Sequence, residues 1–595
     1  MKNNFASLFL PVLLCLLSAQ QVSAPRRSAL VVTHVTVIDA TGGAAKPDVT
    51  VIITGDRISQ IGKSGTIQIP PNAKVVDGRG KFLIPGLWDM HVHWYEKDYL
   101  PLFIANGVTG IRIMFGFPMH HEWRKEIEGG SLLGPQMVIA SRIVDGPRPL
   151  FPGSISVTDE TQARQAVDKI KRENGGDFVK VLSFIPRDAY FAIADESKKQ
   201  GIPFEGHVPL SVTAEEASRA GQKSFEHLTG ILPACSTRSE DLNLAARADL
   251  AEEMVSGKPE LWGPHIRQLR EAMIDSYSPA KAAALSDILR SNGTWQCPTL
   301  TVLRTLGYWN DPSFVNDARL KYMPRAVRTG WDQEANPYGE TPNDLPIARR
   351  ELQRDFEVVG LMQRSGVQIL AGTDTLNKFC FPGFSLHDEL GLLVQAGLSP
   401  MEALQAATLN PARFLGREKD LGTVEAGKFA DLVLLDANPL DDIGNTKKIE
   451  AVFYRGQYFP RASLDHMLAQ AEALASRKSI AEAMMQTIHE KDAAAAVKQY
   501  RDLRATQPNA YDFSENELIR VGYQLIAMKR FKDAIEIFKL SVEAYPESYN
   551  TYDSLAEAYM DDGDTDLAIQ NYRKSLQLNP GNTNAIEKLK KLNRQ

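Results

Sequence analysis

The sequence predicts an α/β protein whose main part is a (β/α)8 TIM-like barrel, accompanied by a small composite β-sandwich and an all-α repeat region. Apolar strand-like runs alternate with helical stretches through the middle of the chain, the pattern of a parallel α/β fold. β-branched, turn-punctuated runs flank that segment on both sides. A helical sequence repeat closes the chain. At 595 residues the chain is also too long for a single core.

The barrel is predicted over residues 85–415, with its first strand beginning just before. Eight apolar runs are the strand candidates: Phe82–Met90, Val108–Met114, Gln136–Ser141, Phe178–Leu182, Pro203–His207, Lys223–His227, Trp295–Leu300 and Gln368–Thr373. Two crossovers, at 230–294 and 301–366, are unusually long, and we expect them to cover the barrel mouth or to pack outside it. Catalytic groups of such barrels lie where the strands end, so residues there are the candidates for chemistry.

The β-sandwich is predicted from two distant blocks, 28–84 and 416–460. The first contains short β-branched runs separated by turn residues, and the second contains a matching block at 422–436. We expect the two blocks to pair, so that one β domain is assembled on either side of the barrel.

After the second block the composition becomes helical. Residues 461–512 are predicted to form a helical linker with a looser copy of the repeat that follows at 513–595. In that repeat Ala534, Phe538 and Pro546 recur 34 residues later as Ala568, Tyr572 and Pro580. The period and residue set resemble tetratricopeptide repeats, which commonly bind a peptide or protein. The alternative is self-association or docking onto the barrel.

The N-terminus predicts a signal peptide at 1–24, and therefore a periplasmic or secreted protein. Lys2 precedes an apolar stretch, Phe5–Leu17, and small residues follow as far as Ala24. The apolar run is shorter than the roughly 20 residues a membrane span needs, so we expect no transmembrane segment after its removal. The net charge of −6 and the lack of a dense basic run exclude a nucleic-acid footprint. The remaining cysteines are expected to be free thiols.

Side chains suited to metal binding stand at the ends of the predicted strands. His91 and His93 are two residues apart, so on a strand both imidazoles face the same point. Lys180 is a cation inside an apolar strand, where it has no ordinary structural reason to be. His207, His227 and Asp374 end three further runs. Together they predict a metal site.

This set resembles the amidohydrolase superfamily in its binuclear form with a carboxylated lysine. The resemblance covers about residues 30–460 and includes 85–93 and the returning 426–432; imidazolonepropionase-like and prolidase-like members are the most similar. It implies that His91, His93, Lys180 and Asp374 hold one divalent ion, while Lys180, His207 and His227 hold the other. Zinc is the expected metal. In the alternative, Lys180 makes a simple salt bridge beside a mononuclear site.

The resemblance also implies a mechanism. A metal-bridging hydroxide would attack the scissile carbonyl, and Asp374 would move a proton to the leaving nitrogen. The expected substrates are small molecules or short peptides with an amide-type C–N bond: a cyclic amide, an N-acyl amino acid or an Xaa-Pro-like dipeptide. The Glu205-Gly206-His207 element departs from the prolidase-like pattern and weakens the dipeptide assignment.

Two other functions stay open from the sequence. One is a lactonase or phosphotriesterase-like esterase on the same metal centre, and the other is a catalytically weak binding scaffold acting through its repeats. Candidate substrate contacts are His120, His121 and Arg142, with a solvated loop or a local ion pair as the alternative. For His387 we expect a supporting or helix-capping role, and for Cys380 a packing role.

Overall fold

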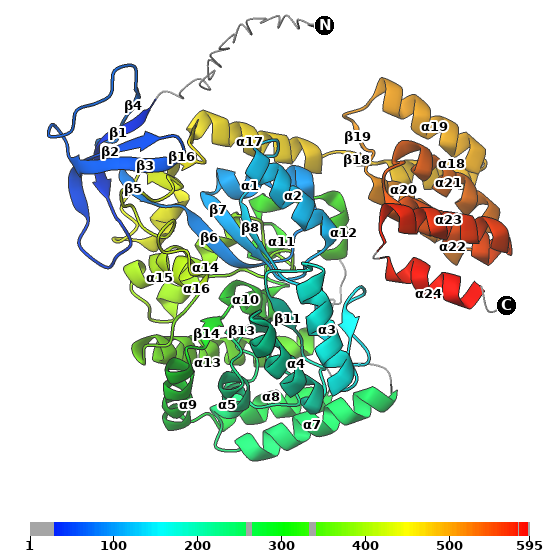
Figure 1. Cartoon of the computed structure of the whole chain (residues 1–595), viewed down its shortest axis with the longest axis horizontal. Helices are drawn as coiled ribbons and strands as arrows, with labels where there is room; N and C mark the ends of the chain where they lie inside the picture. The colour runs from blue at the N-terminus through cyan, green and yellow to red at the C-terminus, as the bar shows by residue number, and fades with distance from the viewer. Residues whose placement is uncertain (1–28, 257–263, 332–340, 581, 593–595) are drawn as a thin grey trace, which may run out of the picture.

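The computed structural model describes residues 29–256, 264–331, 341–580 and 582–592. Three regions follow one another in Figure 1: a mixed sheet, a barrel surrounded by helices, and a set of paired helices that ends the chain. The predicted signal peptide lies outside the described residues. Within the described ranges, no helix is long and apolar enough to cross a membrane.

The mixed sheet is built from both ends of the barrel segment. Its strands are β1 Leu30–Val37, β2 Lys46–Thr54, β3 Arg57–Lys63, β4 Lys74–Asp77, β5 Phe82–Pro85, β15 Leu432–Leu435, β16 Ile449–Tyr454 and β17 Gln457–Pro460. They form one hydrogen-bonded sheet in the order β17-β16-β15-β5-β1-β2-β3, with β4 beside β1. The antiparallel pairing of β5 with β15, in which Leu83 faces Leu434, joins the two blocks. The expected composite β domain is therefore present.

The barrel strands fall into two parallel groups. The first is β6 Leu87–Val92, β7 Val108–Ile113 and β8 Gln136–Ile139. The second is β9 Val144–Asp145, β10 Ile155–Ser156, β11 Val179–Val181, β12 Phe204–Gly206, β13 Ser224–Glu226 and β14 Trp295–Cys297. Isolated parallel bridges pair Ala140 with Phe178, Gln296 with Ile369, and Val92 with Thr375. These bridges connect neighbouring strands around the ring, which is the TIM-barrel arrangement.

Two strand predictions need correction. The run Phe82–Met90 is two strands, because β5 belongs to the mixed sheet and β6 to the barrel. The break falls at Gly86, where an added Cβ would lie 2.3 Å from Thr109 Oγ1, so the chain can pass between the sheets only without a side chain. The run Gln368–Thr373 forms no regular strand: it makes one isolated bridge, at Ile369, and the next bridge falls beyond it at Thr375. Backbone hydrogen bonds still join it to both neighbours, from Leu370 N–H to Gln296 and from Met90 N–H to Ala371.

Helices cover the barrel on its outside. They include α1 Pro101–Ala105, α2 Pro118–Gly129, α3 Glu160–Arg172, α4 Arg187–Gln200, α5 Ala214–Arg219, α9 Pro279–Asn292, α13 Leu345–Arg364, α14 Phe384–Gln395, α15 Pro400–Ala406 and α16 Leu409–Phe414. The side chain of Asp159 shows how such a helix begins: it accepts a hydrogen bond from the backbone N–H of Gln162 and caps α3. The apolar faces of α3, α4 and α13 then pack into the main core.

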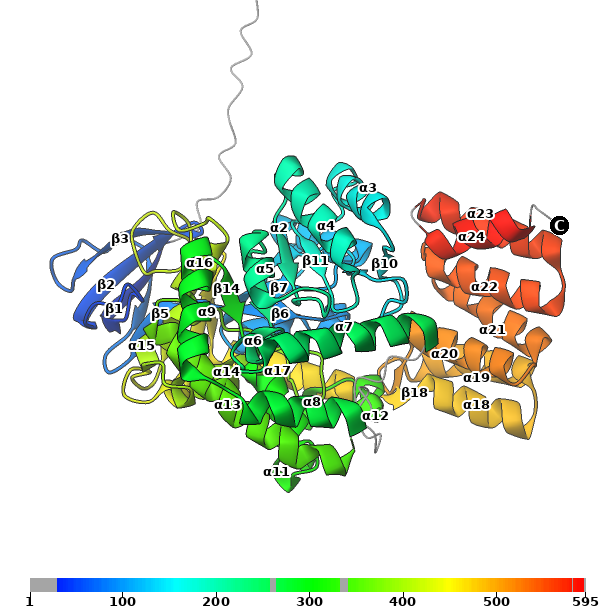
Figure 2. The ribbon, with the colours of Figure 1, turned by 90° about the horizontal axis from the view of Figure 1, so that it is seen from below.

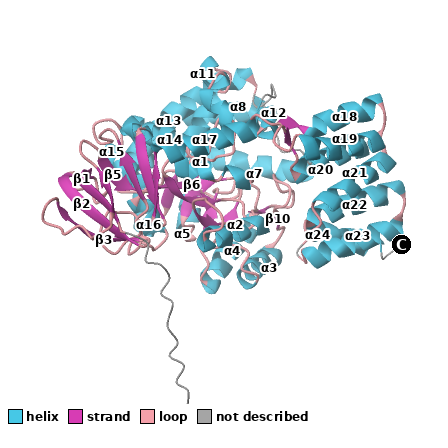
Figure 3. Cartoon of the chain, turned by 90° about the horizontal axis from the view of Figure 1, so that it is seen from above, coloured by secondary structure: helices cyan, strands magenta, loops and turns pink. Residues whose placement is uncertain are grey.

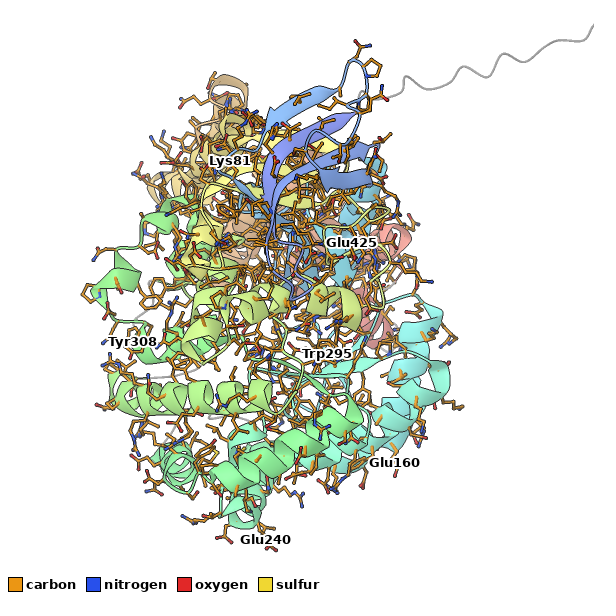
Figure 4. The ribbon with its side chains drawn as sticks, turned by 90° about the vertical axis from the view of Figure 1, so that its left-hand side faces the viewer. Lys81, Glu160, Glu240, Trp295, Tyr308 and Glu425 are labelled. Carbon is orange, nitrogen blue, oxygen red and sulfur yellow. The ribbon has the colours of Figure 1, made fainter. Side chains whose placement is uncertain are left out.

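The long crossovers are helical. They contain α6 Ile231–Ala234, α7 Ser239–Ser256, α8 Pro264–Asp275, α10 Leu300–Tyr308, α11 Pro312–Val315 and α12 Arg325–Trp331. Helix α7, which carries Glu240, runs along the outer edge of the barrel far from the β domain that carries Lys81 (Figure 4). At least this part of the first crossover packs outside the barrel.

The C-terminal region is a stack of helix pairs (Figure 3). Helix α17 Arg461–Ala475 belongs to the barrel core, whereas α18 Ile480–Glu490 and α19 Ala493–Thr506 share a second core with α20 Glu515–Ala527, α21 Phe531–Ala544, α22 Tyr549–Asp562, α23 Thr565–Leu578 and α24 Thr583–Leu592. A short parallel pairing of β18 Lys478–Ser479 with β19 Tyr511–Asp512 closes the first pair. The stack lies at the opposite end of the molecule from the β domain (Figure 2).

Close packing explains the small residues of the repeat. At Gly522 in α20 an added Cβ would lie 2.3 Å from the ring of Phe538 in α21, so only glycine allows this approach. Between stack and barrel, Arg325 of α12 pairs with Glu482 of α18 at 2.6 Å. The repeat helices are therefore tied to the barrel through α12.

Candidate metal centre

The two histidines of β6 point to one place, as their spacing predicts. Nε2 of His91 lies 3.3 Å from Nε2 of His93, and both atoms approach Oδ1 of Asp374, at 3.3 and 3.2 Å. Among the described residues these three form a group whose nitrogen and oxygen atoms can hold one metal ion. The first predicted ligand set is therefore assembled, apart from Lys180.

Lys180 on β11 is a buried amine without a partner. Its side chain is 1% exposed, and in the described part of the protein Nζ makes no hydrogen bond. Burial lowers the pKa of Lys180 to about 8, so a substantial share of the amine is neutral near physiological pH. Gly206 on the adjacent β12 leaves room for the lysine stem, because an added Cβ would lie 3.1 Å from Lys180 Cδ.

His207 and His227 complete the cluster from β12 and β13. Their ring centroids are 5.0 Å apart, and the ring of His227 lies 4.4 Å from that of His91. Burial lowers the pKa of both histidines, to about 4 for His227, so both rings are neutral at pH 7. Neutral imidazole is the form that binds metal.

Hydrogen bonds to two hydroxyl groups orient these rings. The Thr299 hydroxyl donates its hydrogen to the backbone oxygen of Pro298 at 2.7 Å, so it accepts from Nδ1 of His227 at 2.6 Å. The lone pair of His227 is therefore on Nε2. Ser183 Oγ lies 2.8 Å from Nδ1 of His207. Sequence reasoning missed both hydroxyls, because each follows a strand other than the one that carries its histidine.

Asp374 is held in an uncommon backbone conformation. Its φ is +56° and that of His227 is +58°, in the left-handed region that costs a non-glycine residue about 1–3 kcal/mol. Burial raises the pKa of the Asp374 carboxyl, but His227 and His93 act more strongly together and bring it below its ordinary value. The carboxylate is ionised at neutral pH. Its Oδ1 has no hydrogen-bond donor among the described residues.

A buried ion network lies beneath the cluster. Glu226 accepts from Nδ1 of His91 at 2.7 Å and from Arg112 at 2.9 and 3.0 Å, while Arg112 also pairs with Glu205 at 2.6 Å. Since the proton of His91 is on Nδ1, its Nε2 lone pair faces the site. Sequence reasoning missed Arg112 and Glu226. Arg112 carries the same sequence signal as Lys180, because each is a cation inside an apolar strand.

A second group of potential ligands, His91, Glu226 and Cys297, also lies together. Arg112 already neutralises Glu226, and burial raises the pKa of the Cys297 thiol well above its ordinary value. We therefore place the candidate centre on the side of His93 and Asp374, where Lys180 Nζ and Asp374 Oδ1 lack partners. This side offers histidines at three strand ends, an ionised carboxylate and a buried amine without a hydrogen-bond partner. Such a set of groups suits divalent cations.

The weaker candidates have other environments. His120 is buried and uses both ring nitrogens, accepting from the Phe117 N–H at 3.1 Å and lying 2.8 Å from the backbone oxygen of Trp94. It ties α2 to the segment after β6. His121 lies against Arg124 at 3.3 Å. Arg142 lies at the barrel mouth and is considered below.

His387 and Cys380 have packing environments. His387 bridges Thr446 and the backbone oxygen of Asn106, at 3.0 Å each, and its hydrogen bonds reach none of the predicted ligands. Its role is to connect α14 to neighbouring segments. Cys235, Cys297 and Cys380 are buried free thiols.

Comparison with known proteins assigns the family. The model of the amidohydrolase family matches residues 82–458, and a tetratricopeptide repeat model matches residues 549–582. The first match covers the barrel and the returning strands of the β domain. The chain therefore belongs to the amidohydrolase family and carries tetratricopeptide repeat sequence at its C-terminal end.

Similar sequences of known proteins match only in part. An imidazolonepropionase from Shouchella clausii is 40% identical over 121 residues, which is 20% of this chain and 26% of that protein. A 5-methylthioadenosine/S-adenosylhomocysteine deaminase from Thermoanaerobacter pseudethanolicus is 31% identical over 119 residues, 19% of this chain and 28% of that protein. The chain thus spans about a quarter of the length of the relatives it matches.

Solved structures share the fold over a larger part. A bottromycin amidohydrolase aligns with a TM-score of 0.60 at 23% identity and covers 76% of this chain and 91% of its own. A Xaa-Pro dipeptidase aligns with a TM-score of 0.51 at 18% identity, over 73% of this chain and 100% of its own. At these identities the likeness concerns the fold.

Proposed function

We propose that the protein hydrolyses amide-type C–N bonds of small substrates, such as a cyclic amide, an N-acyl amino acid or a short peptide. The observation that carries this proposal is the pair of unsatisfied buried atoms, Lys180 Nζ and Asp374 Oδ1, amid neutral imidazoles. A buried polar atom without a partner costs free energy, so it indicates a missing ligand.

The donor set fits two divalent ions, with zinc the expected metal. His91, His93, Asp374 and a carboxylated Lys180 would hold one, and the same Lys180 with His207 and His227 the other. When bound, such ions lower the pKa of water toward 7 and polarise carbonyl groups. The neutral Lys180 amine can add CO2 with loss of a proton, and the resulting carbamate would supply carboxylate-like oxygens as ligands.

The chain's own groups supply positioning and proton transfer. Glu226 orients His91, and Thr299 orients His227, so both rings keep Nε2 available. Asp374 is ionised, so it can accept a proton at Oδ1 and pass it to the leaving nitrogen. Family membership supports chemistry at C–N bonds over the lactonase or phosphotriesterase alternative.

A substrate panel tests this proposal. Metal-loaded protein should hydrolyse at least one amide class among N-acyl amino acids, dipeptides and cyclic amides faster than matched lactones and phosphotriesters. Asp374→Asn should lower kcat by more than about 100-fold because the proton acceptor is lost, while the folded state persists. Faster turnover of lactones or phosphotriesters would reject the amide assignment, and unchanged activity of the variant would reject the role of Asp374.

Two further proposals concern the rest of the chain. The repeat helices are proposed to bind a peptide or protein partner, which the repeat match supports. The periplasmic or secreted location remains a proposal from the N-terminal sequence.

A further inference from the structure

Arg142 is a partly buried cation that lacks an acidic partner. It follows β8 at the barrel mouth, donates from Nη1 to the backbone oxygen of Gly153 at 3.0 Å, and packs over the ring of Phe117 at 4.6 Å. Within the described ranges no carboxylate pairs with it, whereas Arg112, Arg187 and Arg319 each contact one. Burial lowers the pKa of Arg142 below its ordinary value. A desolvated guanidinium without an anion is costly, and a bound anion would offset that cost.

An apolar cluster lies beside this arginine. Its buried members come from the segments after β7, β8 and β11, and partly buried side chains pack against them. The cluster consists of Phe115, Ile143 and Leu182 with Phe117, Leu150 and Phe151. Leu182 directly follows β11, the strand that carries Lys180. The apolar surface thus begins at the end of that strand.

Aromatic rings connect Arg142 to the candidate ligands. Tyr95, two residues after His93, has its ring centroid 5.9 Å from that of Phe117, the ring that Arg142 covers. These ring contacts lead from the guanidinium to the segment that carries His93. Such an arrangement suits a substrate of amino-acid size, with its scissile bond at the metal centre and a charged group at Arg142.

The walls of this region are held in place. The Asp145 carboxylate accepts from the backbone N–H of Leu150 at 3.1 Å and of Phe184 at 2.9 Å, so it ties together the loops after β9 and β11. Gly153 has φ +85°, and an added Cβ there would lie 3.0 Å from Arg142 Nη1. The guanidinium is positioned before a ligand arrives.

We propose that Arg142 and this apolar cluster form a subsite for an apolar amino-acid portion with a free carboxylate. Arg142 binds the carboxylate through a two-pronged charge-assisted pair, and the cluster takes the aliphatic or aromatic side chain. The inference rests on the proposed hydrolytic function and narrows its substrates to N-acyl amino acids or short peptides that end in an apolar residue. It disfavours uncharged cyclic amides.

The test compares a carboxylate substrate with its neutral analogue. Acetate release from N-acetyl-L-leucine and from N-acetyl-L-leucinamide is measured with the metal-loaded full chain, Arg142→Met and Arg142→Lys. The wild type should prefer the acid by at least about 10-fold in kcat/KM. Arg142→Met should lose about 100-fold on the acid, mainly through KM, with little change on the amide. Arg142→Lys should fall between them, because lysine keeps the charge without the planar fork. The exposed Arg148, in the loop after β9, is the matched control, and Arg148→Met should leave activity on both substrates unchanged.

Binding of 4-methylvalerate, which has the apolar tail and the carboxylate but no amide, separates the two proposals. Calorimetry should show binding to the wild type that weakens at least about 10-fold in Arg142→Met and not in Arg148→Met. Such binding without turnover of either amide would support the subsite and reject the hydrolytic function. Three results would overturn the subsite. They are equal losses of Arg142→Met on both substrates, a wild type that does not prefer the acid, and acid binding that is absent or independent of Arg142.

Discussion

His91 has a different partner on each ring nitrogen, and this difference prepares it for metal binding. Nδ1 faces the Glu226 carboxylate at 2.7 Å, while Nε2 faces His93 and Asp374. Burial lowers the pKa of His91 well below its ordinary value, so the ring stays neutral. Glu226 is in turn held by Arg112, whose guanidinium donates to both carboxylate oxygens. The orientation of one ligand therefore depends on three strands.

Glu226→Gln tests this dependence. The amide keeps the size of the side chain but removes the charge that orients His91 Nδ1, so metal affinity should fall by about 10–100-fold. Competition with a chromophoric chelator measures the affinity. Glu205→Gln is the matched control, because Glu205 also pairs with Arg112 but its hydrogen bonds do not reach His91. Equal losses in the two variants would show that only the charge balance around Arg112 matters.

At the level of elements, a cap and an ion pair hold two helices together on the outside of the barrel. Helix α5 begins with a reciprocal cap in which the Thr213 side chain accepts from Glu216 N–H, and the Glu216 carboxylate accepts from Thr213 N–H at 2.9 Å. Arg187 of α4 donates to the same carboxylate at 2.8 Å. This contact joins two neighbouring helices on the outside of β12 and β13.

The cap predicts a defined pH dependence of stability. Hydrogen bonds from Arg187 lower the pKa of Glu216 to about 2. The unfolded value is about 4.3, so the carboxylate stabilises the fold fully above about pH 5, and this contribution falls as the pH drops toward 2. Glu216→Gln should lower the free energy of unfolding by about 1 kcal/mol at pH 7 and by about half of that at pH 3. Urea unfolding at both pH values measures the difference. Glu215→Gln should change little, and an equal effect of Glu216→Gln at both pH values would contradict the assignment.

Local patterns predicted much of the site and of the fold. The spacing of His91 and His93, the cation at Lys180 and the 34-residue recurrence of Ala534 at Ala568 each report on a few neighbouring residues. The division at Gly86 was missed, because it depends on contact with Thr109 of another strand. The partners Glu226, Thr299 and Ser183 were missed for the same reason. The sequence could not assign a role to His120, because that role depends on the hydrogen-bond partners of its two ring nitrogens.

In the whole molecule, the barrel mouth is bordered by parts that are distant in the sequence. The β domain occupies one end and the repeat stack the other (Figure 2). The stack reaches the barrel through Arg325 and Glu482, and Asp512 of β19 acts electrostatically on Glu96 after β6. Burial is the main cause that raises the pKa of Glu96, to about 7. The repeat region thus adjoins the segment that follows β6.

The metal content of the purified chain tests the central claim, a two-metal centre bridged by Lys180. Elemental analysis of protein expressed with zinc and bicarbonate should find about two ions per chain. Lys180→Ala should hold one ion or fewer, because the bridge is lost, and its thermal unfolding should no longer respond to added metal to the same extent. Fewer than one ion in the wild type, or two ions retained in Lys180→Ala, would contradict the claim.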